Sequence, residues 1–286
     1  MISPATKTAA PEPQYSATVI YGSYSEIRLT QLIAALRRVA PSSVVGDWLG
    51  PVRTPPTDAL GTDMISVDGI SLTLLNVDKA LPAPFFDTGP VPNQLMPNPR
   101  QLLHNHRAYV SVMPAQLPQD GPSAVATARA VTLLAWAVAI VTRAEALKWT
   151  DANNFIPVSV LKGCAAMLSP VGGTAVPIWV RILAGRAHGQ QKIIAGSCGL
   201  WAFGLPEIEY APTDLPLEYL LPHAYSVCLH MFRSDYDVKN NDTIDADGKN
   251  VFKVEAIKHG FFGKAPALRL SWLAASKSFN PNQAMI

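Results

Sequence analysis

His104 and His106 form an H-x-H pair, one of the few arrangements in this sequence that suits metal chemistry. On a strand, residues two apart point to the same side, where two imidazoles can chelate a metal ion. The sequence shows no third ligand nearby, and a motif without its structural context is only a hypothesis. We therefore expect the two histidines to flank a turn, with no metal and no cofactor bound. An enzyme whose site is assembled from sequence-distant residues such as His104, His106 or Cys198 is the alternative.

Cys198 is the second candidate for chemistry, within the sequence AGSCG of residues 195–199. This sequence lacks the G-x-S-x-G spacing of a hydrolase nucleophile, and no base neighbours the thiol in sequence. We expect Cys198 to be a small buried residue. The chain also lacks the glycine-rich motifs that bind nucleotide phosphates. These observations favour a binding protein over an enzyme.

Acidic residues are unevenly distributed along the chain. The 23 Lys and Arg against 21 Asp and Glu give a net charge of +2, which is not the basic excess of a nucleic-acid binder. From Glu207 to Asp247, nine acidic residues face two basic ones, so this stretch carries −7 and the rest of the chain +9. The alternatives are solvated loops or a surface that attracts a basic partner. The residues expected to contact that partner are Asp235, Asp237, Asp242, Asp245 and Asp247.

Glu207 and Glu209 belong to the same acidic stretch and flank Ile208. In an extended segment the two glutamates point to one side of the strand and Ile208 points to the other. With Ile208 packed inward, the two carboxylates are expected to face solvent or a partner. In the alternative structural role, each carboxylate finds an N–H group or a cation within the fold.

Six prolines lie between Leu81 and Arg100. Because proline lacks an amide donor, neither a helix nor a central strand can persist through this segment. We expect a surface loop here, with Phe85 and Phe86 as the apolar residues that anchor a partner.

The remaining sequence predicts hairpins interspersed with helices. Asp68-Gly69 joins two strand-like runs, Met64–Val67 and Ile70–Val77, and is a strong hairpin signal. Ser25 is expected to cap a helix that ends near Val39. The other predicted elements are strands over Tyr15–Ser23, Arg107–Met113, Ile178–Arg186, Lys192–Phe203, Val251–Ile257 and Ala267–Trp272, and helices over Ser123–Arg143, Asn154–Leu168 and Thr213–Ser234.

These elements predict an α+β fold, with a mixed, largely antiparallel sheet packed with helices in one compact α/β sandwich. We expect a flexible tail over residues 1–14, a single domain over 15–277 whose one candidate subdivision is the loop 81–100, and a second tail over 278–286. The longest apolar run, Ala130–Val141, would be about 18 Å long as a helix, against roughly 30 Å of bilayer hydrocarbon. We expect no membrane span and, since the N-terminus lacks the apolar core of a secretory signal, a cytoplasmic protein.

Residues 203–209 read FGLPEIE, and a helix-like stretch and then Asn-Asp-Thr-Ile-Asp over 241–245 follow them. This order resembles a bacterial family of unknown function, DUF4261, in which F-G-x-P-E-[IL]-E precedes a helix and a G-D-T-[IV]-G turn. The resemblance covers about residues 100–257. Asn241 and Asp245 stand where the family has glycines, so we expect a different backbone conformation in that turn.

The resemblance implies a binding function. Some members of the family are encoded beside toxins of type VI secretion systems and look like immunity proteins. The expected function is therefore to bind and neutralise one cognate toxin, such as a restriction-endonuclease-like nuclease, without direct contact to nucleic acid or membrane. An accessory scaffold of a secretion complex is a further alternative.

Overall fold

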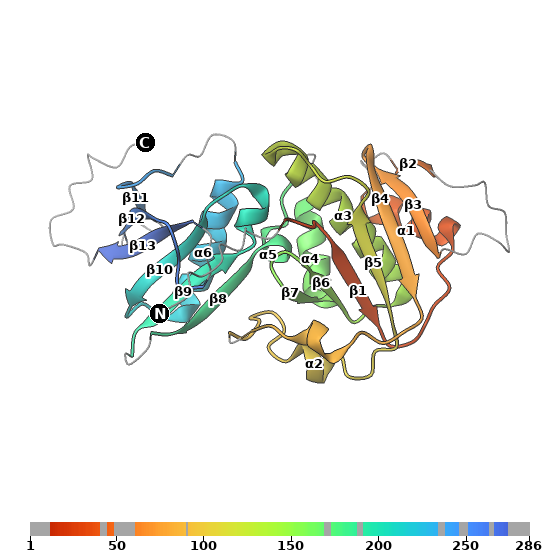
Figure 1. Cartoon of the computed structure of the whole chain (residues 1–286), viewed down its shortest axis with the longest axis horizontal. Coiled ribbons are helices and arrows are strands. Elements are labelled where there is room, and N and C mark those ends of the chain that lie inside the picture. The colour runs from red at the N-terminus through yellow and green to blue at the C-terminus, as the bar shows by residue number, and fades with distance from the viewer. Residues whose placement is uncertain are drawn as a thin grey trace, which may run out of the picture.

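The computed structural model divides the strands between two sheets, which lie side by side in Figure 1 with helices packed against them. Most neighbouring strands are antiparallel, so the expected α+β class is confirmed, with two sheets where the prediction drew one. The structure describes residues 12–40, 45–48, 61–89, 91–168, 173–187, 191–233, 238–245, 251–262 and 266–273. Most of the two predicted tails lies outside these residues.

The N-terminal sheet has seven strands in the order β2-β3-β4-β5-β1-β6-β7, and all neighbours in it are antiparallel. The inner strand β1, fifth in this order, has the sequence ATVIY, and all five side chains are buried because both faces of the sheet are covered there. The strands are β1 (Ala17–Tyr21), β2 (Val45–Trp48), β3 (Thr62–Val67), β4 (Ile70–Val77), β5 (Ala108–Pro114), β6 (Ala146–Trp149) and β7 (Asn154–Pro157).

The hairpin between β3 and β4 turns at Asp68 and Gly69, as the sequence predicted. Both residues have positive φ, 52° and 79°, which is the geometry that makes Asp-Gly a favoured two-residue turn. The Asp68 carboxylate also forms an ion pair with the buried Arg129 of the following long helix. The turn is thereby fixed both locally and through the core.

That long helix, α3 (Gly121–Thr142), is apolar on all sides. A capping box starts it: the Ser123 N–H donates to the Asp120 carboxylate at 2.8 Å, and the Asp120 N–H donates to Ser123 Oγ at 3.1 Å. It packs against the N-terminal sheet, α1 (Leu29–Val39) and α4 (Val158–Leu168). Among the described helices, α3 alone is long and apolar enough to cross a bilayer, but 78% of its apolar window is buried, as in a core helix of a soluble protein.

The C-terminal sheet has six strands in the order β11-β12-β13-β10-β9-β8, with one parallel pair, β10 and β13. α6 (Leu217–Met231) packs against it. Pro222 lies inside α6, yet the helix is continuous from Leu217 to Met231. The strands are β8 (Arg181–Arg186), β9 (Ile193–Cys198), β10 (Glu207–Thr213), β11 (Thr243–Asp245), β12 (Val251–Ile257) and β13 (Ala267–Leu273).

Three predicted helix starts are wrong. The helix expected over Thr213–Ser234 starts at Leu217, because Thr213 is the last residue of β10. The helix expected to follow a Ser25 cap starts at Leu29, and its N-cap residue is Arg28. The helix expected over Asn154–Leu168 starts at Val158, because residues 154–157 form β7 and pair with β6. Pro157 ends the strand and precedes the helix, a position that suits its missing amide.

Aromatic side chains join the two sheets into one hydrophobic core. Trp179, in α5 (Val176–Trp179), is fully buried, and its ring centroid lies 5.6 Å from that of Phe203 in the 3-10 helix η2 (Leu200–Phe203). Its Nε1 donates to Thr132 Oγ1 of α3 at 2.9 Å. These contacts run from the helix behind the first sheet to the turn that enters the second.

Candidate functional site

A proline-rich segment, described over residues 81–89 and 91–103, covers part of the outer face of the N-terminal sheet, and we call it the cap. It contains the short helices η1 (Ala83–Phe86) and α2 (Pro99–Leu102), and in Figure 1 it lies below that sheet. The cap belongs to the connection between β4 and β5, which are adjacent antiparallel strands that about two to five residues could join. Long connections with so little secondary structure are usually functional, which makes the cap our first candidate for a site.

The cap is held down by its own apolar cluster, separate from the main core. Four of its side chains are buried against three side chains on the outer face of β1, β6 and β7. The cluster comprises Leu81, Phe86, Met96 and Leu103 of the cap, and Ile20, Ala146 and Phe155 of the sheet.

Phe85 and Phe86 do not stand out from the loop as the sequence suggested. Phe86 is buried, stacked on Phe155 with ring centroids 5.8 Å apart and edge-on to His106. It is therefore unavailable as the expected anchor for a partner. Phe85 is half-buried, with its ring edge-on to Phe155, and its contact with a partner stays a prediction.

Arg181, the first residue of β8, binds the middle of the cap through backbone carbonyls. Its Nη1 donates to the Thr88 carbonyl at 3.0 Å, and its Nη2 donates to the Val91 carbonyl. The side chain is buried, and burial lowers the pKa of its guanidinium, although an arginine stays protonated at any physiological pH. A residue of the second sheet thus fixes a loop that lies over the first.

Lys148 of β6 holds the beginning of the cap in a similar way. Its Nζ donates to the Phe85 carbonyl at 2.7 Å and lies 4.0 Å from the centroid of the Phe85 ring. Burial, and secondarily the nearby charge of Arg181, lowers the pKa of Lys148 to about 8. The ammonium group is thus held by a carbonyl and an aromatic face, both of which favour a cation.

His106 is a structural residue at the end of the cap. The Leu81 N–H donates to its Nε2 at 2.8 Å, so Nδ1 carries the proton and donates to the Leu103 carbonyl at 2.6 Å. His104 is exposed, and its Nδ1 lies 2.5 Å from the Gln101 carbonyl. The two rings therefore lie in different environments. The residues that carry them belong to a turn, not to a strand. The described residues contain no group of three or more His, Cys, Asp or Glu arranged for a metal ion.

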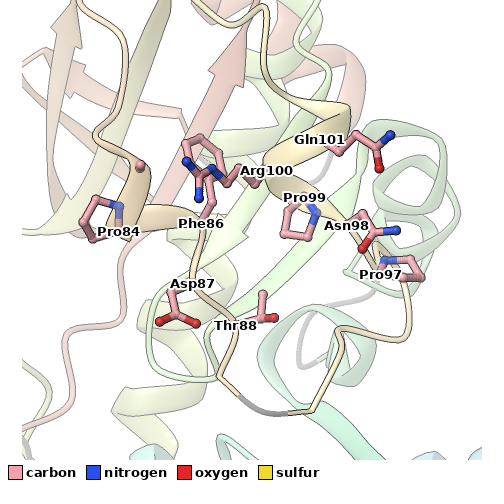
Figure 2. Close-up of a pocket in the computed structure, with 10 residues that line it drawn as sticks. Pro84, Phe86, Asp87, Thr88, Pro97, Asn98, Pro99, Arg100 and Gln101 are labelled. Atoms are coloured by element: carbon pink, nitrogen blue, oxygen red, sulfur yellow. The ribbon is translucent and has the colours of Figure 1, made fainter.

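Between η1 and α2 the cap surrounds an open hollow of about 820 Å³. Figure 2 shows Asp87 and Thr88 at one border and Pro99, Arg100 and Gln101 at the other. Arg100 forms no ion pair with any described residue. Its guanidinium is thus available to a ligand.

Exposed side chains extend this surface beyond the hollow. Leu102, the last residue of α2, is 58% exposed, more than any other large apolar side chain in the described part of the chain. His104 and Arg107 follow it and are also exposed. The end of the cap and the turn after it therefore expose an apolar side chain that has polar and cationic neighbours in the sequence.

Glu207 is buried and structural, contrary to the expectation that it faces solvent or a partner. Its carboxylate accepts the N–H of Gly199 at 2.8 Å, the N–H of Trp201 at 3.2 Å and the hydroxyl of Ser197. Burial raises the pKa of Glu207, and these hydrogen bonds oppose the rise. The carboxylate caps η2, the turn that precedes its own strand.

Glu209 is also buried, so the same expectation is wrong for it. It accepts Nε of Arg269 at 2.7 Å across the β10–β13 pair, and the Phe261 N–H at 2.5 Å. The segment 258–262 passes so close that a Cβ at Gly260 would lie 2.6 Å from Glu209 Oε2. Both glutamates therefore meet the structural alternative, in which each carboxylate finds an N–H group or a cation.

Little of the predicted acidic loop falls within the described residues. Asp235, Asp237 and Asp247 lie outside them, and Asp245 is described only as the end of β11. Asp242 is exposed and accepts the Lys239 N–H at 2.6 Å. Contact of this loop with a partner stays a prediction.

Cys198 is half-buried at the end of β9. Burial, together with the charge of Glu207, raises the pKa of its thiol to about 12. A thiol with so high a pKa is a poor nucleophile at neutral pH, in keeping with the expected role as a small packed residue.

The comparison with known families concerns the C-terminal sheet. Residues 196–271 match the family model of a domain of unknown function, DUF4261. The match runs from β9 to β13 and includes α6, whereas the N-terminal sheet and the cap lie outside it. No curated protein and no solved structure matches the chain. The resemblance over residues 100–195 stays a prediction.

Residues 203–209, which carry the resemblance to DUF4261, have structural roles here. Phe203 packs against Trp179, Gly204 ends η2 with a φ of 72°, and Glu207 caps η2 from the next strand. In the second motif, Asn241 has a φ of 74°, the left-handed region that glycine adopts freely and asparagine tolerates. Asn241 thus adopts a backbone conformation open to glycine, and the expected difference from the turn of the family stays a prediction.

Sequence reasoning missed Arg100, Leu102, Lys148 and Arg181. Leu102 and Arg100 follow a proline in a short helix, a pattern common to many surface turns. Lys148 and Arg181 bind backbone carbonyls, which every residue has, so no pattern of residue types indicates these partners. Only the cluster of prolines pointed to this region of the chain.

Proposed function

We propose that this protein is a cytoplasmic immunity protein that binds and neutralises a cognate type VI secretion toxin, and that it is not an enzyme. The DUF4261 match in residues 196–271 agrees with the resemblance on which this function rests. The observation that carries the binding role is the cap, a long loop fixed from beneath and open on its outer side.

Fixation of the cap favours binding because a loop that is already ordered loses little conformational entropy when a partner docks. Lys148 and Arg181 hold three of its carbonyls, and the Asn153 side-chain amide donates to a fourth, that of Asp87, at 2.9 Å. These donors stand on the sheets and on the turn between β6 and β7. Such rigid scaffolding of a loop is the usual architecture of recognition surfaces.

The groups with the greatest potential for chemistry support the same proposal. Glu207, Glu209 and His106 each have structural partners, and the thiol pKa of Cys198 is raised. A nuclease toxin presents basic groups to phosphate, so the acidic loop around the exposed Asp242 would accelerate association with it. The cap would supply contacts that slow dissociation.

Co-expression tests the proposal. The gene product encoded next to this protein is induced in a sensitive host with and without this chain, and growth and complex formation by size-exclusion chromatography are followed. We expect protection and a stable complex of the two proteins. A complex without protection would favour the scaffold alternative. If the chain gives neither protection nor a complex, the proposed function is wrong.

A further inference from the structure

The geometry points to the hollow of the cap as the docking site for an extended segment of a partner protein that carries a carboxylate beside an apolar side chain. This inference rests on the proposed binding function and names the chemistry of the partner. Four features of the hollow lead to it: its shape, its apolar lining, its charges and its fixed walls.

The shape of the hollow suits a polypeptide better than a small molecule. Small-molecule sites enclose most of the surface of their ligand, whereas this hollow of about 820 Å³ opens widely to solvent between η1 and α2. Its exposed apolar lining comprises Ala83, Pro84 and Pro97. Proline rings are rigid, so an apolar side chain can pack on them at little cost in conformational freedom of the loop.

The polar lining supplies partners for a peptide that bears a carboxylate. Arg100 forms no ion pair with the described residues, and its planar guanidinium matches a carboxylate with two parallel hydrogen bonds. Asn98 and Gln101 are exposed beside it, and their amides can both donate to and accept from a peptide backbone. Asp87 lies at the opposite border and accepts the Gly89 N–H at 2.8 Å through one oxygen, so its second oxygen can accept a backbone N–H of the bound segment.

Both walls of the hollow are fixed by the fold. The η1 wall is held by Lys148, and the Asp87–Thr88 border by Asn153 and Arg181. The α2 wall ends at Leu103, whose carbonyl accepts from His106. The hollow therefore exists before the partner arrives.

Three short synthetic peptides test the inference by NMR titration of the full chain. They carry Glu-Leu, Gln-Leu or Lys-Leu in an otherwise identical Gly/Ser background. We expect the Glu-Leu peptide to shift amide signals of the cap, including those of Thr88, Asn98 and Gln101, and to bind about tenfold more tightly than the Gln-Leu peptide, the effect of one good charged contact.

Arg100→Glu should reverse the preference, so that the Lys-Leu peptide binds more tightly than the Glu-Leu peptide. The matched control is Lys253→Glu, which reverses an exposed charge on β12 of the other sheet and should leave all three affinities unchanged. Equal affinities of the Glu and Lys peptides for the wild type, or equal effects of the two variants, would overturn the inference.

Failure of this inference and failure of the proposed function give different results. If the chain neutralises a toxin and Arg100→Glu protects cells as well as the wild type, the function stands and the docking site is wrong. If no neighbouring gene product is neutralised but the peptides behave as expected, the docking site stands and the immunity function is wrong.

Discussion

The two sheets hold neighbouring segments of the chain by opposite chemistry. Beneath the cap, the cations of Lys148 and Arg181 donate to loop carbonyls. In the C-terminal sheet the carboxylate of Glu209 accepts an amide from segment 258–262, and Glu207 accepts amides from η2. Six residues of the cap are prolines without an N–H, and donors on the sheets bind its carbonyls, whereas segment 258–262 contains no proline and offers an amide to a carboxylate. The sign of the charge under each loop matches the backbone groups that it binds.

Burial differs between the two arrangements as well. Glu209 is 2% exposed, whereas Lys148 is only half-buried. The loops themselves differ in the opposite sense: segment 258–262 has no buried residue, whereas the cap buries Leu81, Phe86, Met96 and Leu103. Local opening is easier where fewer groups are buried, so we expect the C-terminal loop to open at a lower free energy than the cap. The following substitutions test this difference, from the largest expected effect to the smallest.

Glu207→Ala should lower the free energy of unfolding by about 3 kcal/mol. The change leaves buried N–H and O–H groups without an acceptor and creates a cavity. Urea denaturation monitored by circular dichroism measures the loss. Glu207→Gln keeps one acceptor oxygen and the side-chain volume, so its loss should be about 1 kcal/mol. Equal losses for both variants would show that the acceptor is unimportant.

Glu209→Ala should cost about 2 kcal/mol, because it breaks a buried ion pair whose partner Arg269 is 29% exposed and can regain water. The matched control is Glu255→Ala on β12, an exposed glutamate whose backbone position pairs with the same Arg269. We expect that change to stay within about 0.5 kcal/mol. Thermal unfolding of the two variants side by side makes the comparison.

Arg181→Met should cost about 1.5 kcal/mol overall, since a buried charge is removed along with its hydrogen bonds. Its main effect should be local, as faster hydrogen exchange of cap amides with little change in the C-terminal sheet. Arg186→Met removes an exposed arginine from the same strand and serves as the control. Uniformly faster exchange in both sheets would contradict a cap-specific role.

Lys148 should give the smallest effect, visible only in the pH dependence of stability. Its pKa of about 8 lies below the usual 10.5, so between these values the unfolded chain binds more protons than the folded one. Stability of the wild type relative to Lys148→Met should therefore rise with pH over this interval, by about 1 kcal/mol. A constant difference between the two proteins from pH 7 to pH 10.5 would mean that the lysine is not desolvated.

Local signals in the sequence were sufficient for several elements of the fold. The Asp68-Gly69 turn depends on the φ preferences of its own two residues, and β12 occupies the predicted residues 251–257. β6 has only four residues, and no alternation of polar and apolar residues predicts it. Because it pairs with residues 154–157, these residues form β7 where the sequence predicted the start of a helix. Strand pairing overrode the local pattern there.

The site was less predictable because its contacts are distant in sequence. The alternation around Ile208 predicts that Glu207 and Glu209 point to the same side of the strand. It does not predict that segment 258–262 and the η2 turn bury them, because these segments are not identified by the residues next to the glutamates. Burial of Phe86 likewise depends on Phe155 in another element. The proline cluster located the cap, and the packing beneath it required the structure.

The all-round apolarity of α3 has a consequence for synthesis on the ribosome. When this helix emerges, α1 and β1–β5 are available to cover one side, but α4, Trp179 and η2 are still to be translated. The nascent chain must therefore carry an uncovered apolar helix until residues up to about 203 have emerged, and exposed surface of this kind attracts chaperones and promotes aggregation. A fragment ending after β6 would keep that liability permanently, so expression of the N-terminal half alone requires a redesigned outer face of α3.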